Sequence, residues 1–263
     1  MKQAILLAAY GAGGVQGAHT LQLFERMVRE AYPDSSIRWA FTSMLMRNRL
    51  AAARKKTDSI AKALCRLGFE RYTHVAVQSL HMIPGSEYED LQNEVAEAQK
   101  CGAPAKISIG TPLLHSRLDI EQAADAIIGS LPAERVADEA VIWVGHGTAH
   151  EGGSAYDHLT NALQARDRNI FIGTIAREEQ GVEQLLPSLR ERGVSRAWLM
   201  PLLSVVGKHA MQDIAGEGKD SWRHTLEQYE ISCKAVLRGA IEYQGFADIW
   251  MNHLREAMAA YAK

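Results

Sequence analysis

The sequence predicts an α/β fold in which two similar domains each carry a doubly wound parallel sheet. Three observations support this prediction: the length of the chain, an alternation of short apolar runs with helical patterns, and a similarity between its two halves. The 263 residues exceed the usual size of one domain, and they suit either one large α/β unit or two domains of roughly 130 residues each.

Short apolar runs mark the expected strands, and longer stretches with helical spacing separate them. Strands joined through helices normally run parallel and are covered on both faces, so each half of the chain is expected to form its own parallel sheet. The expected strands are residues 4–10, 37–42, 74–80, 107–109, 140–144, 170–175, 197–203 and 231–237.

The two halves also resemble each other in sequence. The segment LLAAYGAGG at 6–14 matches IWVGHGTAH at 142–150, which places Tyr10 opposite His146 at an offset of 136 residues. Any two doubly wound units share apolar strands and glycine turns, but a second match occurs in the same order and favours a duplication. It sets 67–90 beside 192–213 at an offset of 122, with Gly85 opposite Gly207 and Glu87 opposite His209.

The boundary between the domains is expected where prolines interrupt the pattern, at Pro112 after a strand and at Pro132 after a helix. We therefore predict an N-terminal domain over 1–125 and a C-terminal domain over 126–263. The last segment, 246–261, carries apolar residues on one face of a helix. We expect it to pack back onto a domain, with the N-terminal domain as one candidate.

Composition excludes several classes of protein. Charged residues make up 23% of the chain and the formal net charge is −2, so there is no global electrostatic reason to bind nucleic acid or an anionic membrane. No apolar run approaches the length that spans a bilayer. The separated cysteines Cys65, Cys101 and Cys233 predict neither a disulfide framework nor a thiolate zinc site. We expect a cytoplasmic protein with no nucleic-acid or membrane partner, and a homo-oligomer stays open.

His146 follows an expected strand and is flanked by Gly145 and Gly147. The carboxyl end of a strand in an open parallel sheet faces the ligand crevice, so this histidine is a candidate functional residue. Glycines on both sides let another atom approach closely. The alternative is a capping or core histidine in a tight turn.

His209 also lies just past a strand end, and Asp213 follows four residues later on an expected helix. This spacing puts both side chains on one face of the helix. Asp213 could then orient His209, as carboxylates do for metal-bound imidazoles. The alternative is a histidine at a helix start beside a solvated aspartate.

His81 stands at the end of the expected strand, directly after 74–80, and Glu87 and Glu89 follow it. By the internal match this loop corresponds to the loop of His209, so its carboxylates are expected to face the same cleft from the other side. Paired acids there could transfer protons or guide a cation. The alternative is that they occupy the first turn of a helix, where acidic residues favour the helix dipole.

Several familiar motifs are incomplete. Gln16 stands where the last glycine of a dinucleotide loop belongs and no Walker lysine follows, so neither NAD nor ATP is expected. Ser154 replaces the second histidine of a zincin helix, and there is no G-x-S-x-G elbow. The densest basic cluster could contact substrate carboxylates or form a solvated helix face. It comprises Arg47, Arg49, Arg54, Lys55 and Lys56.

Longer segments are typical of one family. They are ILLAAYG at the start, AFTS at 40–43, QSLHMIPGSEYE at 78–89, G-x-PLL at 110–114, GHGTAH at 145–150 and MPLLSVVGKHAMQDIAGEGKDSW at 200–222. Through them nearly the whole chain resembles the anaerobic (class II) sirohydrochlorin cobaltochelatases of cobalamin biosynthesis. The resemblance implies two Rossmann-like lobes with an active-site cleft between them that holds the tetrapyrrole. It also implies that His146 and His209 bind the metal and take part in proton removal.

The family's third metal ligand is a glutamate, and the most direct alignment places Ala176 at its position. Glu178 or Glu179 could reach the metal instead, or a water could fill the position. We take Glu178 as the third ligand.

The resemblance therefore predicts a lyase-class chelatase that inserts Co²⁺ into sirohydrochlorin and releases two protons. Neutral imidazole both ligates borderline metals and accepts protons, which suits His146 and His209. Glu89 is assigned a catalytic role. The residues assigned to substrate binding are Tyr10, His81 and Glu87. The alternatives are a chelatase acting with Fe²⁺ or Ni²⁺ at the same site, and a bilobed metal or tetrapyrrole carrier without turnover.

Overall fold

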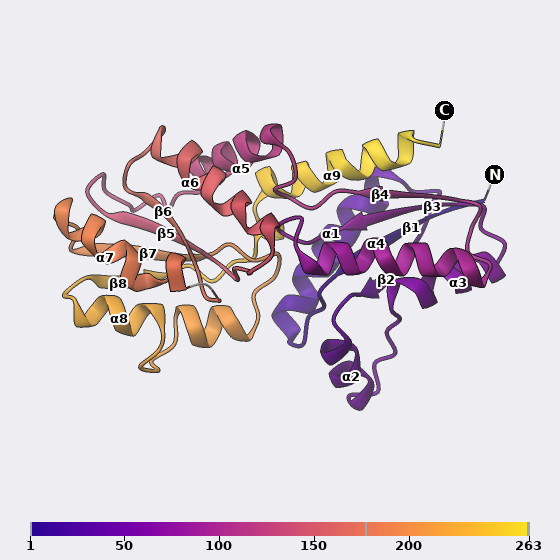
Figure 1. The fold of residues 1–263 in the computed structure, drawn as a ribbon, viewed down its shortest axis with the longest axis horizontal. Coiled ribbons are helices and arrows are strands. Elements are labelled where there is room, and N and C mark those ends of the chain that lie inside the picture. Colours follow the sequence, from indigo (N-terminus) through magenta and orange to yellow (C-terminus); the bar gives the residue numbers. More distant parts are fainter. Residues whose placement is uncertain (1, 177, 262–263) are drawn as a thin grey trace. The chain divides into compact units, whose positions relative to one another are not determined.

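The computed structural model contains two α/β units, each built on a four-stranded parallel sheet (Figure 1). The structure describes residues 2–176 and 178–261. The first unit comprises Met1–His115 and Ala247–Lys263, and the second comprises Ser116–Phe246. We expected the boundary between the domains after residue 125. In the structure the second unit begins at Ser116, and the chain returns to the first unit at Ala247.

The sheet of the first unit has the strand order β2-β1-β3-β4, and all of its pairs are parallel. Its strands are β1 (Gln3–Ala9), β2 (Ser36–Phe41), β3 (His74–Ser79) and β4 (Lys106–Gly110). Its helices are α1 (Val15–Ala31), α2 (Met44–Ala52), α3 (Ile60–Phe69), α4 (Ser86–Ala98), the 3₁₀ turn η1 (Gln99–Cys101) and most of α9 (Gln244–Ala259).

The sheet of the second unit has the order β6-β5-β7-β8 and is also parallel throughout. Its strands are β5 (Ala140–Gly145), β6 (Ile170–Thr174), β7 (Arg196–Pro201) and β8 (Ser232–Ala235). Its helices are α5 (Arg117–Gly129), α6 (Ser154–Gln164), α7 (Val182–Glu191) and α8 (Trp222–Gln228), with short turns η2 (Glu151–Gly153), η3 (Glu178–Gln180), η4 (His209–Ile214) and η5 (Ala240–Glu242). The prediction of two similar doubly wound parallel sheets is confirmed.

Matching backbone hydrogen bonds relate the two sheets residue by residue. The Leu80 amide donates to the Ala8 carbonyl at 2.7 Å, and the Leu202 amide donates to the Val144 carbonyl at 2.8 Å. The two donors are 122 residues apart and the two acceptors 136 apart, which are the offsets of the sequence matches. The internal similarity therefore corresponds to equivalent positions in the two sheets.

The central strands β1 and β5 are buried on both faces, as expected for a sheet between two helical layers. Alternate residues of β1 join a core with α3 and α4, and the equivalent residues of β5 join a core with α7 and α8. The equivalent core residues are Ala4, Leu6 and Ala8 in the first unit and Ala140, Ile142 and Val144 in the second.

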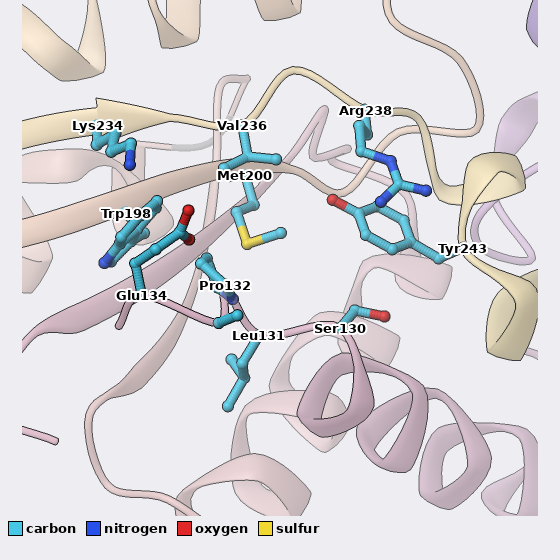
Figure 2. Close-up of a pocket in the computed structure, with 11 residues that line it drawn as sticks. Ser130, Leu131, Pro132, Glu134, Trp198, Met200, Lys234, Val236, Arg238 and Tyr243 are labelled. Carbon is cyan, nitrogen blue, oxygen red and sulfur yellow. The ribbon is translucent and has the colours of Figure 1, made fainter. Parts of the chain in front are cut away.

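The edge strands β4 and β8 are covered differently. Ser108 on β4 donates a side-chain hydrogen bond of 2.8 Å to the Ala257 carbonyl of α9. The equivalent residue on β8 is Lys234, since it pairs with Trp198 as Ser108 pairs with Ala76. This part of β8 borders a cavity of about 360 Å³, in which Figure 2 shows the Tyr243 phenol beside the Arg238 guanidinium.

A disulfide joins Cys65 on α3 to Cys101 on η1, with Cα atoms 5.9 Å apart. The expectation that the cysteines do not pair was therefore wrong for these two. The two residues are 36 positions apart, and they meet because α3 and α4 pack side by side. Cys233 keeps a free thiol, and burial raises the pKa of that thiol to about 12.

Among the helices of the described residues, none combines the length and the apolar composition needed to cross a bilayer.

Candidate metal centre

His146 lies directly after β5 and is exposed. Its Nδ1 is 3.0 Å from the Gly147 carbonyl oxygen. A carbonyl oxygen can only accept, so Nδ1 carries the hydrogen and the lone pair is left on Nε2. Sequence reasoning could not find this partner, because a backbone carbonyl leaves no trace in the residue types.

The glycines on either side of His146 make room for the protein's own side chains. A Cβ on Gly145 would lie 2.7 Å from the Tyr156 ring, and a Cβ on Gly147 would lie 2.7 Å from Thr174. Gly147 also has a φ of +81°, which strains most other residues. The two glycines thus fix the turn that presents His146 at the carboxyl edge of the sheet.

His209 begins the π-helical turn η4, and its side chain is 47% exposed. Its Nδ1 is 2.5 Å from Oδ2 of Asp213. The carboxylate accepts from Nδ1–H, so Nε2 again carries the lone pair. The expected contact between His209 and Asp213 is present, and it is the arrangement that fixes the orientation of metal-binding imidazoles in other proteins.

The two histidines lie next to each other, because they follow the paired strands β5 and β7. Their ring centroids are 5.0 Å apart and the ring planes meet at 81°. A metal about 2.1 Å from an imidazole nitrogen lies about 3.2 Å from the ring centre, so this spacing would give an angle of about 100° at an ion that both Nε2 atoms bind. That angle is close to the tetrahedral value.

Ala176, where the resemblance led us to expect a glutamate ligand, is next to His146 in the structure. The Ala176 amide donates to the His146 carbonyl at 2.8 Å, and the Ala176 side chain is exposed. Glu179 is exposed on η3, whereas the side chain of Glu178, which we took as third ligand, lies outside the described residues. The described residues include no group of three His, Cys, Asp or Glu side chains placed to hold a metal.

The substrate-binding candidates Tyr10 and His81 belong to the first unit. Tyr10 follows β1 and is 45% exposed. His81 is buried, with Nδ1 2.9 Å from Ser79 Oγ and Nε2 3.1 Å from Thr42 Oγ1. Burial lowers the pKa of His81 to about 4. Contact with a ligand would require His81 to give up one of these two hydroxyl partners.

Glu87 and Glu89, expected to act on substrate, lie in the first turn of α4. Glu87 is half-buried and Glu89 is exposed. Acidic residues at this end of a helix are favoured by the helix dipole. The helix dipole therefore explains the position of both glutamates without a role in substrate binding or catalysis.

The fold and the site define this chain as a two-unit parallel α/β protein that carries two adjacent, exposed histidines, His146 and His209, in its second unit. The sequence model of one family, described as cobalt chelatase (CbiK), matches residues 3–259. The chain belongs to this cobalt chelatase (CbiK) family.

Two curated relatives carry a more specific name. The sirohydrochlorin cobaltochelatase CbiKC of Nitratidesulfovibrio vulgaris is 49% identical over 259 residues, which cover 98% of this chain and 92% of the relative. The sirohydrochlorin cobaltochelatase of Salmonella typhimurium is 31% identical over 260 residues, which cover 98% and 97%.

Solved chelatases share the fold at lower identity. SirB from Bacillus subtilis with Fe³⁺ gives a TM-score of 0.68 at 14% identity, covering all of this chain and 98% of SirB. The sirohydrochlorin chelatase SirB from Bacillus subtilis subspecies spizizenii, in complex with cobalt, gives 0.67 at 15% identity over the same shares. These likenesses support the two-unit α/β fold.

Proposed function

We propose that this chain is an enzyme that inserts Co²⁺ into sirohydrochlorin and releases two protons. The names of two relatives that match almost the whole chain support the substrate and the metal. The single observation that carries the proposal is the pair His146 and His209, whose rings lie 5.0 Å apart with each Nδ1 held by an acceptor.

The ligand atoms of the proposed site are the Nε2 atoms of His146 and His209. Neutral imidazole ligates Fe²⁺, Co²⁺ and Ni²⁺ with affinity that rises in this order, so affinity alone does not make the histidines select cobalt. The Asp213 carboxylate offsets part of the positive charge that a bound ion brings to His209. Glu178 remains the proposed third ligand, with Glu179 or a water as alternatives.

The same nitrogens can serve the proton transfers. An imidazole Nε2 has one lone pair, so it cannot hold the metal and accept a proton at the same time. As the ion moves to the ring nitrogens of the tetrapyrrole, each Nε2 is released and can take one pyrrole proton. Two histidines thus match the two protons that insertion displaces, with His146 as the first acceptor.

The residues of the first unit take the remaining proposed roles. Tyr10, His81 and Glu87 contribute to substrate binding, and Glu89 transfers protons or guides the cation. Tyr10 has the clearest physical basis, because it combines exposure with the position equivalent to His146.

The test is an absorbance assay with sirohydrochlorin, Co²⁺ and the protein at a tenth or less of the substrate concentration, with neither NAD nor ATP added. Many turnovers per protein chain support the enzyme. An absorbance change that stops after one equivalent of sirohydrochlorin per protein chain supports a carrier and contradicts the proposal. Parallel assays with Fe²⁺ and Ni²⁺ show whether cobalt is the preferred substrate metal.

A further inference from the structure

The two units differ most in the segment that follows the second strand of each sheet. In the first unit β2 ends at Phe41 and α3 begins at Ile60, whereas in the second unit β6 ends at Thr174 and α7 begins at Val182. The longer segment contains α2, which projects from the first unit below β2 (Figure 1).

This segment starts at the position that corresponds to the family's metal-ligand position. The Ser43 amide donates to the Tyr10 carbonyl at 3.4 Å, as the Ala176 amide donates to the His146 carbonyl. Ser43 also caps α2 by accepting from the Met46 amide. The segment therefore starts in the first unit at the place that Ala176 occupies next to His146 in the second.

The segment carries a strong local positive charge in a chain whose formal net charge is −2. Residues 44–57 contain five basic side chains and no Asp or Glu. Arg49, Arg54, Lys55 and Lys56 are exposed, and no carboxylate of the described residues forms a salt bridge with them. The next acid along the chain, Asp58, is already paired with Lys62 and Arg66.

Exposed apolar side chains lie on the same edge of the first unit. They follow β1 and β2, and they account for four of the exposed large hydrophobic residues: Tyr10 at 45%, Val15 at 91%, Met44 at 67% and Leu45 at 56%. Apolar surface next to unpaired cations suits a ligand that is itself apolar in its body and anionic at its rim.

The base of the segment is fixed to the sheet. Arg47 donates to the carbonyls of Phe41 and Thr42 at the end of β2. Leu50 is buried, and Met46 lies so close to Gly11 that a Cβ there would be 2.5 Å from the methionine Cγ. Met46, Arg47 and Leu50 thus anchor the segment that carries the exposed cations, and Arg47 has a structural role.

We propose that residues 44–57 recognise the carboxylate arms of the tetrapyrrole substrate, while Tyr10, Met44 and Leu45 contact its apolar macrocycle. This proposal rests on the proposed function, which supplies a substrate with an apolar ring and several carboxylates. Each exposed ion pair contributes little on its own. Recognition therefore depends on several cations acting together, and salt weakens it.

The test compares two triple variants with the same change of charge. In the first, Arg49→Gln, Lys55→Gln and Lys56→Gln neutralise the segment. In the control, Arg26→Gln, Arg71→Gln and Lys106→Gln remove three other exposed cations of the first unit. We expect the first variant to bind metal-free sirohydrochlorin about tenfold more weakly at low salt, because three weak pairs sum to about 1.4 kcal/mol.

The kinetic readout separates recognition from chemistry. We expect KM for sirohydrochlorin to rise about tenfold in the first variant, kcat to stay within about twofold, and the salt dependence of binding to flatten. The control variant should keep the affinity and the salt dependence of the unaltered protein. Met44→Ser with Leu45→Ser should weaken binding with the salt dependence intact.

Three outcomes would overturn the proposal. The two triple variants could bind sirohydrochlorin with equal affinity, or the first variant could lose kcat with no change in KM. The third outcome is that the unaltered protein binds heparin as tightly as sirohydrochlorin. Binding of metal-free sirohydrochlorin is measured without Co²⁺, so it is independent of turnover. The unaltered protein could bind sirohydrochlorin through this segment and yet insert no metal. That result would contradict the proposed function and leave the recognition proposal standing.

Discussion

The third strand of each sheet leads into a helix, and the two helices differ. In the first unit β3 leads into the regular helix α4, whereas in the second unit β7 leads into the π-helical turn η4. The Glu89 amide donates to the Gly85 carbonyl, and at the same offset of 122 the Met211 amide donates to Gly207. The difference therefore lies within equivalent segments of the two units.

The change of helix type accompanies a change of side-chain role. Leu91 of α4 is fully buried in the core, and its counterpart Asp213 on η4 is partly exposed and bonded to His209. The Ala215 amide bonds to the Ala210 carbonyl five residues earlier, which widens the turn. Such turns are frequent at functional sites. One scaffold thus supports a packing helix in one unit and an exposed histidine–carboxylate pair in the other.

The largest expected effect separates His146 from its counterpart Tyr10. We expect His146→Ala and His209→Ala each to lower the rate of Co²⁺ insertion by about 10²- to 10⁴-fold, because each removes a ligand and a proton acceptor. Tyr10→Phe should retain turnover within about tenfold, since no metal role is assigned to the phenol. Stopped-flow absorbance measures both, and circular dichroism checks the fold. Near-normal turnover of either alanine variant would remove that histidine from the site.

A second prediction concerns stability and contrasts buried His81 with the exposed histidines of the second unit. The pKa of His81 is lowered to about 4 in the folded protein, so the unfolded chain binds more protons between about pH 4 and 6.5. Stability of the first unit should be complete above pH 6.5 and fall by up to about 3 kcal/mol as the pH drops to 4. Amide hydrogen exchange in β3 measures this, with β7 as internal reference.

The control for this prediction is His81→Asn, which keeps a polar group near Ser79 and Thr42 without the titration. The variant should lose the extra pH dependence in β3. The protection of the β3 amides from hydrogen exchange could fall with decreasing pH no faster in the unaltered protein than in the variant. In that case the titration of His81 does not limit stability.

A third, smaller effect tests the carboxylate on η4. We expect Asp213→Asn to weaken Co²⁺ binding by about 10- to 100-fold, because the partner that fixes and charge-compensates the His209 ring is lost. Isothermal calorimetry without tetrapyrrole gives the affinity. Asp138→Asn, an exposed acid before β5, is the matched control and should have no effect. Equal affinities of the two variants would show that Asp213 does not support the metal site.

The smallest expected effect concerns equivalent positions after β6 and β2. Ala176→Glu should tighten Co²⁺ binding by about tenfold, or about 1.4 kcal/mol, if no other carboxylate fills the third position. Ser43→Glu, the same change in the first unit, should leave metal affinity unchanged. If Glu178 is the third ligand, Ala176→Glu will change little and Glu178→Gln will weaken binding, and calorimetry distinguishes the two results.

The sequence by itself determined the layered architecture of this protein. Runs such as 140–144 predicted buried strands, because a strand covered on both faces must be apolar on both. The matches that paired Tyr10 with His146 and Gly85 with Gly207 predicted equivalent backbone positions, since duplicated strands keep their register. The sequence also selected His146, His209 and Asp213, because strand-end position and helical spacing are local properties.

Only the tertiary structure decided which groups meet. The pairing of Cys65 with Cys101 depends on how α3 packs against α4, and sequence spacing does not contain that information. The burial of His81 between two hydroxyls likewise arises from neighbouring strands. The tautomer of His146 depends on a backbone carbonyl, which every residue possesses, so its partner is defined by the three-dimensional turn at Gly147 and by no residue type.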